Sequence, residues 1–273
     1  MSFRVTAREA WKSQSDLVLG SAQKFGDMRN ICLHLAYDGT NFHGWQIQPN
    51  LETIQGHVTR VIEEITEERV QVHGSGRTDA GVHALAQVCN FKVTSSIPFA
   101  NLKKAMNSLL PHDIRVSRIL EVPEDFHARF DAKVKTYRYR ILNSQFCSPF
   151  QYRYVNHCPA NLDFEAMSRA APMVVGEFDF SSFCDSDTEV SSKARRIATS
   201  FFVFDTLHDL LEYNVCANGF LHHMVRNLVG TFLEVGKGKL SPEDVQSILA
   251  AHNRSTAGPT APAKGLFLVS VEY

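Results

Sequence analysis

Residues 74–84 read GSGRTDAGVHA, and the rest of the chain is arranged around this stretch. Its three glycines allow the backbone to bend sharply or to approach another group closely. The preceding residues 69–73 alternate in polarity like a short strand, and residues 85–93 have the pattern of a second strand. We therefore expect Asp79 to lie in a loop between two strands, where a rigid scaffold can hold a reactive side chain.

The loop contains one cation and one carboxylate, Arg77 and Asp79. It is not a phosphate-binding P-loop, because no Gly-Lys-Ser/Thr follows the glycines, and its spacing differs from a dinucleotide fingerprint. A carboxylate beside an arginine stays ionised and fixed in direction, which suits a nucleophile better than a general acid. The alternative is an ordinary glycine-rich turn in which Asp79 binds only its own backbone.

The first half of the chain shows the order β-α-β-β-α-β, which is the split-βαβ unit. Polar and apolar residues alternate in four predicted strands, at residues 31–37, 69–73, 85–93 and 114–122. Apolar positions at helical spacing predict one helix at residues 54–65, capped by Thr53, and another at residues 99–109, stopped by Pro111.

The second half repeats this order of elements without repeating the sequence. The predicted strands lie at residues 134–142, 196–204, 210–217 and 266–271. Helices are predicted at residues 162–174 and 220–235, and a further helix starts at Ser241 and Pro242. We predict an α+β fold in which two ferredoxin-like halves join into a long mixed, mostly antiparallel sheet, flanked by helices and with a central cleft.

Three segments follow from this division. Residues 29–130 form the half with the Asp79 loop, and residues 131–273 complete the cleft. Residues 1–28 are predicted to be a flexible N-terminal extension, because their longest apolar run is too short for a secretory signal. Acidic residues within the extension also weigh against an organelle transit peptide.

The composition is that of an ordinary globular protein, with 44% hydrophobic and 21% charged residues among 273. No apolar run approaches the roughly 18 residues of a membrane span. A formal net charge of −1 argues against a general nucleic-acid binder, so any RNA-binding surface requires locally gathered basic residues. Such a group is present at Arg129, Lys133, Lys135, Arg138 and Arg140.

The six cysteines form no Cys-x-x-Cys pair. We therefore predict neither a disulfide framework nor a structural zinc site, but free thiols in a reducing compartment such as the cytoplasm. Cys147, His157 and Cys158 match no zinc-ligand spacing, so no metal is expected there.

The run GRTDAGVHA at residues 76–84 closely resembles the signature of TruA-type tRNA pseudouridine synthases. Other segments agree in the same order: YDGT at 37–40, FHGWQ at 42–46, FHAR at 126–129, KTYRY at 135–139, DFSSF at 179–183, HMVRN at 223–227 and AGPTAP at 257–262. The resemblance covers roughly residues 30–273 and implies the same α+β fold with its active site in a cleft.

The resemblance also implies an activity. Members of this family isomerise uridine to pseudouridine at positions 38, 39 and 40 of the tRNA anticodon stem-loop. Their partner is tRNA, and the bacterial enzymes are homodimers without metal or organic cofactor. The reaction moves the bond at ribose C1′ from uracil N1 to C5, so it needs neither redox chemistry nor a metal in principle. The sequence leaves open attack at C1′, attack at C6 and a glycal route.

Five site residues follow from the resemblance. Asp79 corresponds to the catalytic nucleophile, and Arg226 to the arginine that pairs with it. Tyr137 corresponds to the active-site tyrosine that packs on the uracil of a flipped-out uridine. Arg77 and Leu266 correspond to substrate-binding residues. The structural alternatives are a core aromatic at Tyr137, an arginine at 226 that extends to solvent, and a core leucine at 266.

Four basic residues are predicted to contact RNA phosphates: Arg129, Lys133, Arg138 and Arg140. His43, His83, His222 and His223 are not assigned as general acids, and His83 is expected to make a loop hydrogen bond. The family's usual GEHDF appears as GEFDF at residues 176–180, which removes a histidine there.

Two rival functions use the same features. Split-βαβ units with aromatic side chains on the sheet also occur in RNA-binding modules without catalysis, but no RNP-type consensus is present. A glycosidase-like hydrolase would use Asp79 with a second carboxylate such as Asp38, and it would release free uracil.

Overall fold

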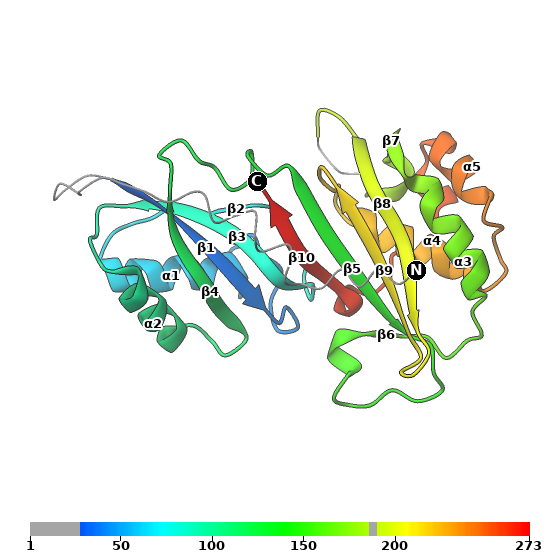
Figure 1. Ribbon diagram of the computed structural model, residues 1–273, viewed down its shortest axis with the longest axis horizontal. Helices are drawn as coiled ribbons and strands as arrows, with labels where there is room; N and C mark the ends of the chain where they lie inside the picture. The colour runs from blue at the N-terminus through cyan, green and yellow to red at the C-terminus, as the bar shows by residue number, and fades with distance from the viewer. Residues whose placement is uncertain (1–27, 186–189) are drawn as a thin grey trace, which may run out of the picture.

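The structure of the protein, a computed structural model, describes residues 28–185 and 190–273. The predicted N-terminal extension lies outside these ranges except for Met28. One long sheet runs through the described part (Figure 1). Its strands are β1 (Arg29–Tyr37), β2 (His73–Gly74), β3 (His83–Val93), β4 (Ile114–Val122), β5 (Val134–Leu142), β6 (Asn156–His157), β7 (Gly176–Asp179), β8 (Ala194–Asp205), β9 (Leu210–Ala217) and β10 (Leu266–Glu272).

Both halves contain the same four-strand arrangement. The sheet order is β4-β1-β3-β10-β5-β9-β8-β7, with β2 paired to β3 and β6 paired to β5. If the main strands of each half are numbered along the chain, both halves show the order 4-1-3-2, and all their pairs are antiparallel. The predicted α+β class, the two ferredoxin-like halves and the mostly antiparallel sheet are confirmed.

The last strand of the chain, β10, joins the two halves. On one edge it pairs antiparallel with β5, and on the other it pairs in parallel with β3, where Phe267 lies opposite His83 and Leu268 opposite Ala84. Figure 1 shows β10 in red between β3 and β5. Because the glycine-rich loop leads directly into β3, this pairing brings the loop against the second half.

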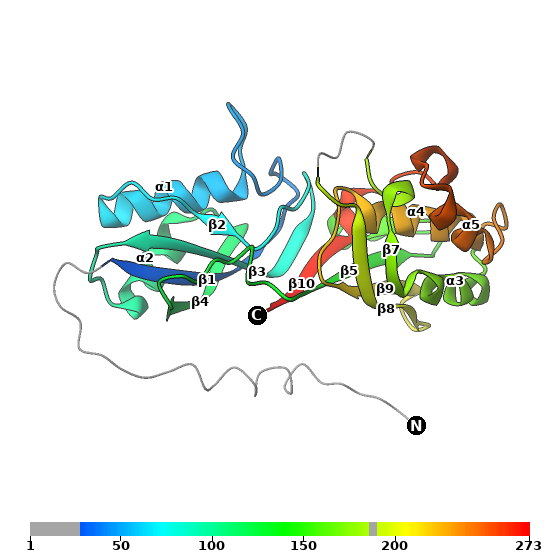
Figure 2. The same cartoon turned by 90° about the horizontal axis from the view of Figure 1, so that it is seen from above.

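The described residues contain five α-helices: α1 (Ile54–Thr66), α2 (Phe99–Leu109), α3 (Phe164–Ala170), α4 (Met224–Gly236) and α5 (Asp244–Ala251). In Figure 2, α1 and α2 lie at one end of the sheet, α3, α4 and α5 lie at the other, and β10 runs between the two groups. No helix within the described ranges has both the length and the apolar character needed to cross a membrane.

The predicted strand at residues 69–73 is wrong for most of its length, because only its last residue belongs to β2. Side chains of α1 take up the backbone groups that a longer strand would pair. Glu63 accepts a hydrogen bond from the Val70 backbone nitrogen, and Gln55 donates one to the Val72 carbonyl. β2 itself pairs only with Asn90 and Cys89, and it ends before it reaches the start of β3, where β10 pairs with His83 and Ala84.

Capping side chains set the starts of two helices. Thr53 caps α1 as predicted, and Asp163 caps α3 through the backbone nitrogen of Ala166. Helix α3 ends at Ala170 and continues as a 3-10 turn rather than reaching residue 174 as an α-helix. Pro172 explains this difference, because it has no backbone N–H for the next α-helical hydrogen bond.

Helices α4 and α5 begin later than predicted. His223 adopts a left-handed backbone with φ 58°, so α4 starts at Met224 and residues 220–223 form a turn before it. Ser241 and Asp244 exchange hydrogen bonds between side chain and backbone, which is a reciprocal cap. Regular α5 therefore begins at Asp244, three residues after the predicted start.

A glycine brings α4 close to the loop of residues 257–262. An added Cβ at Gly230 would lie 1.6 Å from the Pro259 carbonyl oxygen, so no larger residue fits without movement. The same loop binds Arg226, whose carbonyl accepts from the Ala261 nitrogen and whose Nε donates to the Ala261 carbonyl at 2.8 Å. Helix packing at Gly230 therefore sets the position of Arg226.

This contact predicts an unusual sign for a helix substitution. Replacing glycine by alanine inside a helix normally stabilises a protein by about 1 kcal/mol. We expect Gly230→Ala instead to lower the free energy of unfolding by about 1–3 kcal/mol, because the new methyl group collides with the loop. Denaturant unfolding would measure it, with Ser247→Ala on the exposed face of α5 as control, expected within about 0.5 kcal/mol of the parent. A stabilised Gly230→Ala variant would contradict the close contact.

Candidate active site

A cleft of about 1260 Å³ lies between the two halves of the sheet. The glycine-rich loop of the first half forms one wall, and parts of β5, α4 and the start of β10 form the other. Five residues singled out in the sequence line this cleft: Arg77, Asp79, Tyr137, Arg226 and Leu266. The fold therefore brings together side chains that are separated by up to 189 positions in the chain.

Buried hydrogen bonds hold the loop from below. The Ser75 hydroxyl donates to Oε1 of Gln87 on β3 at 2.6 Å. The hydroxyl groups of Tyr37 and Thr78 lie 2.8 Å apart, and the Thr78 carbonyl accepts from the Trp45 backbone nitrogen at 3.0 Å. These contacts fix the backbone on the N-terminal side of Asp79.

Two of the loop's glycines are required by its shape. Gly81 has φ 78°, the left-handed conformation that glycine favours, and it turns the chain into β3 two residues after Asp79. Gly74 lies under the indole ring of Trp45, where an added Cβ would come within 2.5 Å of the ring. The loop is therefore a rigid turn, and the Asp79 side chain leaves it toward the cleft.

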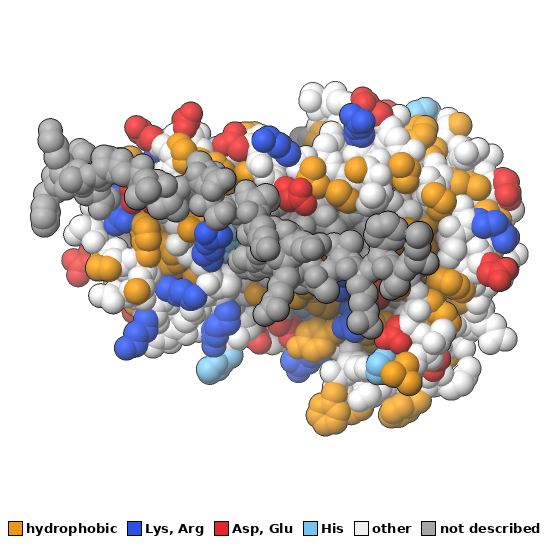
Figure 3. Space-filling view, viewed as in Figure 1, with side chains coloured by type: hydrophobic (Ala, Val, Ile, Leu, Met, Phe, Trp, Pro, Cys, Tyr) orange, Lys and Arg blue, Asp and Glu red, His pale blue; other side chains and the backbone are white. Residues whose placement is uncertain are grey.

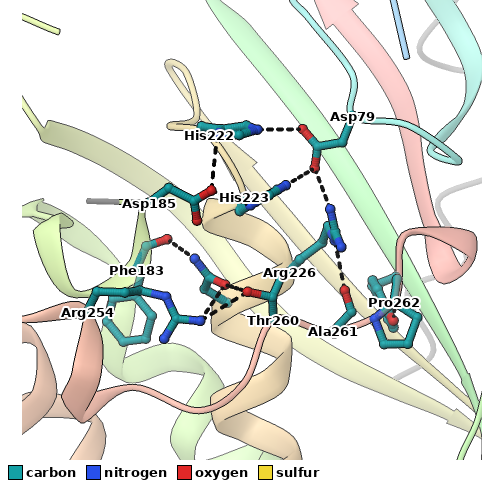
Figure 4. A network of polar contacts seen from close by, with 12 residues as sticks. Asp79, Phe183, Asp185, His222, His223, Arg226, Arg254, Thr260, Ala261 and Pro262 are labelled. Carbon is teal, nitrogen blue, oxygen red and sulfur yellow. Dashed lines mark hydrogen bonds and ion pairs between the residues drawn. The ribbon is translucent and has the colours of Figure 1, made fainter. Parts of the chain in front are cut away.

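Asp79 forms an ion pair with Arg226 across the cleft (Figure 4). Nη1 of Arg226 donates to Oδ2 of Asp79 at 2.9 Å, and the two side chains are only 15% and 19% exposed. The second bond of Arg226, from Nε to the Ala261 carbonyl, fixes the plane of its guanidinium group. A largely buried arginine requires such partners, because an unpaired buried charge is costly.

Two stacked histidines lie between Asp79 and Asp185 (Figure 4). Nε2 of His222 and Nε2 of His223 lie 3.6 and 3.4 Å from the Asp79 carboxylate. The Nδ1 atoms of the same rings lie 3.3 and 2.7 Å from Oδ2 of Asp185. A neutral imidazole has one N–H and donates to one carboxylate, whereas an imidazolium donates to both. The carboxylate of Asp79 is thus surrounded by basic groups on two sides.

Together with Asp79, the same histidines form the one cluster among the described residues whose ligand atoms are close enough to hold a metal ion. Asp79, His222 and His223 offer ligand atoms within 4.8 Å of one another. Arg226 already occupies Oδ2 of Asp79, so a metal ion would compete with a cation that the fold provides. The absence of a metal stays a prediction that rests on the reaction chemistry.

Tyr137 and Leu266 form an apolar part of the cleft wall. Tyr137 lies on β5 with only 8% of its surface exposed, and its ring packs edge-on against Phe220 with centroids 5.0 Å apart. Burial raises the pKa of the Tyr137 hydroxyl, and the nearby Asp79 charge adds to the shift, so the group stays protonated at neutral pH. Leu266 is also buried, at the start of β10.

Lys135 points into the cleft from the same side of β5 as Tyr137. Its Nζ donates to the Ser75 carbonyl in the glycine-rich loop at 2.6 Å. Burial, followed by the positive charges of Arg129 and Arg195, lowers the pKa of Lys135 to about 8. The three cations leave this part of the cleft ready to accept an anion.

The predicted RNA-contacting residues fall into two groups. Arg129 lines the cleft, and Lys133 is exposed close to it in sequence. Arg138 and Arg140 point to the opposite face of β5, outside the cleft, and both form ion pairs with Glu212 at 3.5 and 3.3 Å. Their role in RNA binding stays a prediction, and it concerns a different surface from that of Arg129.

Asp38 and His83 connect the first half to residues 153 and 154 of the second half. His83 accepts from the Gly39 nitrogen through Nδ1, and its Nε2 lies 3.0 Å from the Arg153 carbonyl in the second half. Burial lowers the pKa of His83, and Oδ1 of Asp38, 3.1 Å from the same Nδ1, opposes this shift without reversing it. Asp38 accepts a hydrogen bond from the Tyr154 hydroxyl at 2.8 Å and does not line the cleft. The expected loop hydrogen bond of His83 is therefore present.

Comparison with known proteins shows which family the chain belongs to. A family model described as tRNA pseudouridine synthase matches residues 34–131 and 170–273. The chain belongs to the tRNA pseudouridine synthase family. This membership confirms the family and the enzyme class, an isomerase, that the sequence predicts.

Individual relatives cover nearly the whole chain. Proteins named tRNA pseudouridine synthase A are 49% identical over 249 residues in Solibacter usitatus and 47% identical over 246 residues in Caldicellulosiruptor saccharolyticus. Each match spans 90% of this chain and 100% of the relative. A third, from Halalkalibacterium halodurans, is 47% identical over 240 residues, which span 88% of this chain and 90% of the relative.

Three side chains of this candidate site, those of His222, His223 and Asp185, were not assigned to it from the sequence. His222 and His223 precede Arg226 by four and three positions, a helical spacing that places them near the same site. This spacing could have indicated their place from the sequence, although both residues precede α4, which begins at Met224. Asp185 carries no local signal, because it meets the histidines only through tertiary contacts.

The pKa of Lys135 predicts a pH dependence for tRNA binding by this family member. Below about pH 8 the side chain is an ammonium ion that attracts phosphate, and above it the charge is lost. We expect the Kd for unmodified tRNA to rise by up to about tenfold between pH 7 and pH 9. In Lys135→Arg, which stays charged, this rise should disappear. Parallel pH profiles of both proteins would contradict a contact between Lys135 and the RNA.

Proposed function

We propose that the protein isomerises uridine to pseudouridine at positions 38, 39 and 40 of the tRNA anticodon stem-loop, with Asp79 as the nucleophile. The observation that carries this proposal is the Asp79 carboxylate, fixed by Arg226 at 2.9 Å inside a cleft that both halves of the fold form. Family membership supports the reaction on uridine in tRNA, and the carboxylate supports the role of Asp79.

The chemistry fits a carboxylate that an ion pair holds in place. The bond from ribose C1′ to uracil N1 breaks, the base turns, and a bond from C1′ to C5 forms with loss of the C5 proton. Covalent attack by Asp79 would divide this exchange into smaller steps. The ion pair with Arg226 engages Oδ2 of Asp79, which His223 also faces, and leaves Oδ1 directed toward His222. Attack at C1′, attack at C6 and a glycal route all begin from this arrangement.

The neighbouring side chains have roles that fit a flipped-out uridine. The ring of Tyr137 and the side chain of Leu266 offer an apolar surface for the uracil. Because its pKa is raised, the Tyr137 hydroxyl would take up the C5 proton only as it passes its own proton on to another base. Arg77, exposed at the cleft and donating to Gln46 at 3.0 Å, would hold the phosphate of the target nucleotide or fill the space that its base leaves.

We further propose that the protein is a cytoplasmic homodimer. Within each chain, residues 29–130 and 131–273 would form the two halves of one catalytic unit. All six cysteines are free, and four of them are buried, which suits a reducing compartment. A dimer would combine the basic surfaces of two chains, each of which has a net charge of −1.

The hydrolase alternative loses its support, because Asp38 is engaged by Tyr154 and does not line the cleft. A non-catalytic RNA-binding module has no use for a largely buried carboxylate and arginine, which are costly to bury. The isomerase is therefore the function that the geometry supports best.

Replacing Asp79 by Asn tests the nucleophile. Asn has a similar shape but lacks the charge, so we expect turnover to fall by at least about 10³-fold while the Kd for tRNA changes by less than about threefold. The measurement uses a tRNA transcript that carries tritium at uracil C5. Tritium release to water is followed, and pseudouridine is mapped in the anticodon arm.

The controls for this assay separate the two rival functions. Wild-type protein should release tritium and form pseudouridine without free uracil, which a hydrolase would release. Full turnover by Asp79→Asn would exclude the nucleophile, and binding without tritium release by the wild type would favour the non-catalytic module.

The two groups of basic residues predict different salt dependences. Each phosphate contact adds about one unit to the slope of log Kd against log salt concentration. We expect Arg129→Gln to lower this slope by about one. A smaller change is expected for Arg138→Gln and Arg140→Gln, because Glu212 already neutralises part of their charge. Titration of each variant with unmodified tRNA over a series of salt concentrations measures this, and equal slopes in all proteins would remove Arg129 from the interface.

A further inference from the structure

An aromatic ladder lines the cleft wall of the first half, away from Asp79's ion pair. It consists of His73 on β2, His127 and Phe130, with ring centroids 4.6 Å apart for the first pair and 4.3 Å for the second. All three residues line the same cleft as Asp79. Figure 3 shows hydrophobic and basic side chains interspersed over one face of the molecule. A single exposed aromatic side chain is therefore ordinary on this surface. Three packed rings that line the cleft are a more specific feature.

Phe130 is the open end of this ladder. Its side chain is 74% exposed although its neighbour His127 is partly buried, so one face of the last ring has no aromatic partner among the described residues. The guanidinium group of Arg129 lies 5.7 Å from the centre of the Phe130 ring. Arg129 also contributes to the positive potential at Lys135 in the cleft. An open aromatic face beside a cation is the combination that binds unpaired nucleobases with their phosphates.

The segment that carries Phe130 is fixed before any ligand binds. The backbone nitrogens of Phe130 and Asp131 both donate to the His127 carbonyl at 3.1 Å. The carboxylate of Asp131 accepts from the His127 nitrogen at 2.8 Å, which closes the turn. Ala128, inside the turn, donates to Asn90 on β3 at 2.9 Å. Holding an exposed aromatic ring in a rigid turn reduces the entropy that binding costs.

We propose that Phe130 is a stacking platform for an unpaired nucleobase of the substrate RNA other than the target uridine, with Arg129 beside its phosphate. This inference rests on the proposed function, because it places the RNA in the same cleft. It adds a second point of attachment on the wall opposite Tyr137. The RNA would then be held at two bases, the target uridine near Asp79 and one loop base on Phe130.

The test replaces the ring without unfolding the protein, since Phe130 is exposed. We expect Phe130→Leu, which stays apolar but cannot stack, to raise the Kd for unmodified tRNA about tenfold, and Phe130→Tyr to restore binding. The kcat at saturating tRNA should stay within about twofold of the parent. Phe150→Leu is the matched control, because Phe150 is 90% exposed and lies outside the cleft.

A spectroscopic measurement identifies the base. An anticodon stem-loop RNA carries 2-aminopurine at one loop position at a time, and stacking quenches its emission. We expect quenching at one position with the wild type, Phe130→Tyr and Phe150→Leu, and its loss with Phe130→Leu. Unchanged Kd and quenching in Phe130→Leu would overturn the platform.

Binding and turnover fail independently in this design. If the wild type forms no pseudouridine, the proposed function fails, although quenching at Phe130 still reports RNA binding. If Asp79 is needed for turnover but Phe130→Leu behaves like the wild type, the platform alone is wrong.

Discussion

The parallel pairing of β10 with β3 is the contact on which the site depends. Each half is a ferredoxin-like unit that places its helices over its own strands, and neither half contains both members of the Asp79–Arg226 pair. By pairing on one edge with β3 and on the other with β5, β10 turns two sheets into one. Main-chain hydrogen bonds then fix the distance between the loop that carries Asp79 and the helix that carries Arg226.

The join depends on where β2 ends. β2 stops at Gly74, opposite Cys89, and the chain then turns away as the glycine-rich loop, so the edge of β3 at His83 and Ala84 is open for β10. The two walls of the cleft come from the two sides of this join, because the loop leads into β3 and Tyr137 lies on β5, which pairs with the other edge of β10.

The cleft also separates charges within a chain that is nearly neutral. The carboxylates of Asp79 and Asp185, the guanidinium group of Arg226 and two histidine rings form a compact polar network whose members hold one another in place (Figure 4). On the first-half side, Arg129 lies beside the ladder of His73, His127 and Phe130, and its charge acts on Lys135 of the second half. A net charge of −1 therefore conceals a local surface that suits an anionic, aromatic ligand such as RNA.

By itself, the sequence determined most of the helices and strands and which charged residues the glycine-rich loop carries. Strands such as 114–122 and 134–142 match β4 and β5, because alternation over nine residues is a local property. The run at residues 76–84 marked Asp79 as the candidate nucleophile, and the resemblance predicted the pairing with Arg226 that the structure contains. Only the tertiary structure decided that β10 joins β3, that residues 69–72 pair with no strand, and that Asp185 and Lys135 reach the site. These features depend on contacts between residues far apart in the chain, and neither propensity nor periodicity records which distant groups meet.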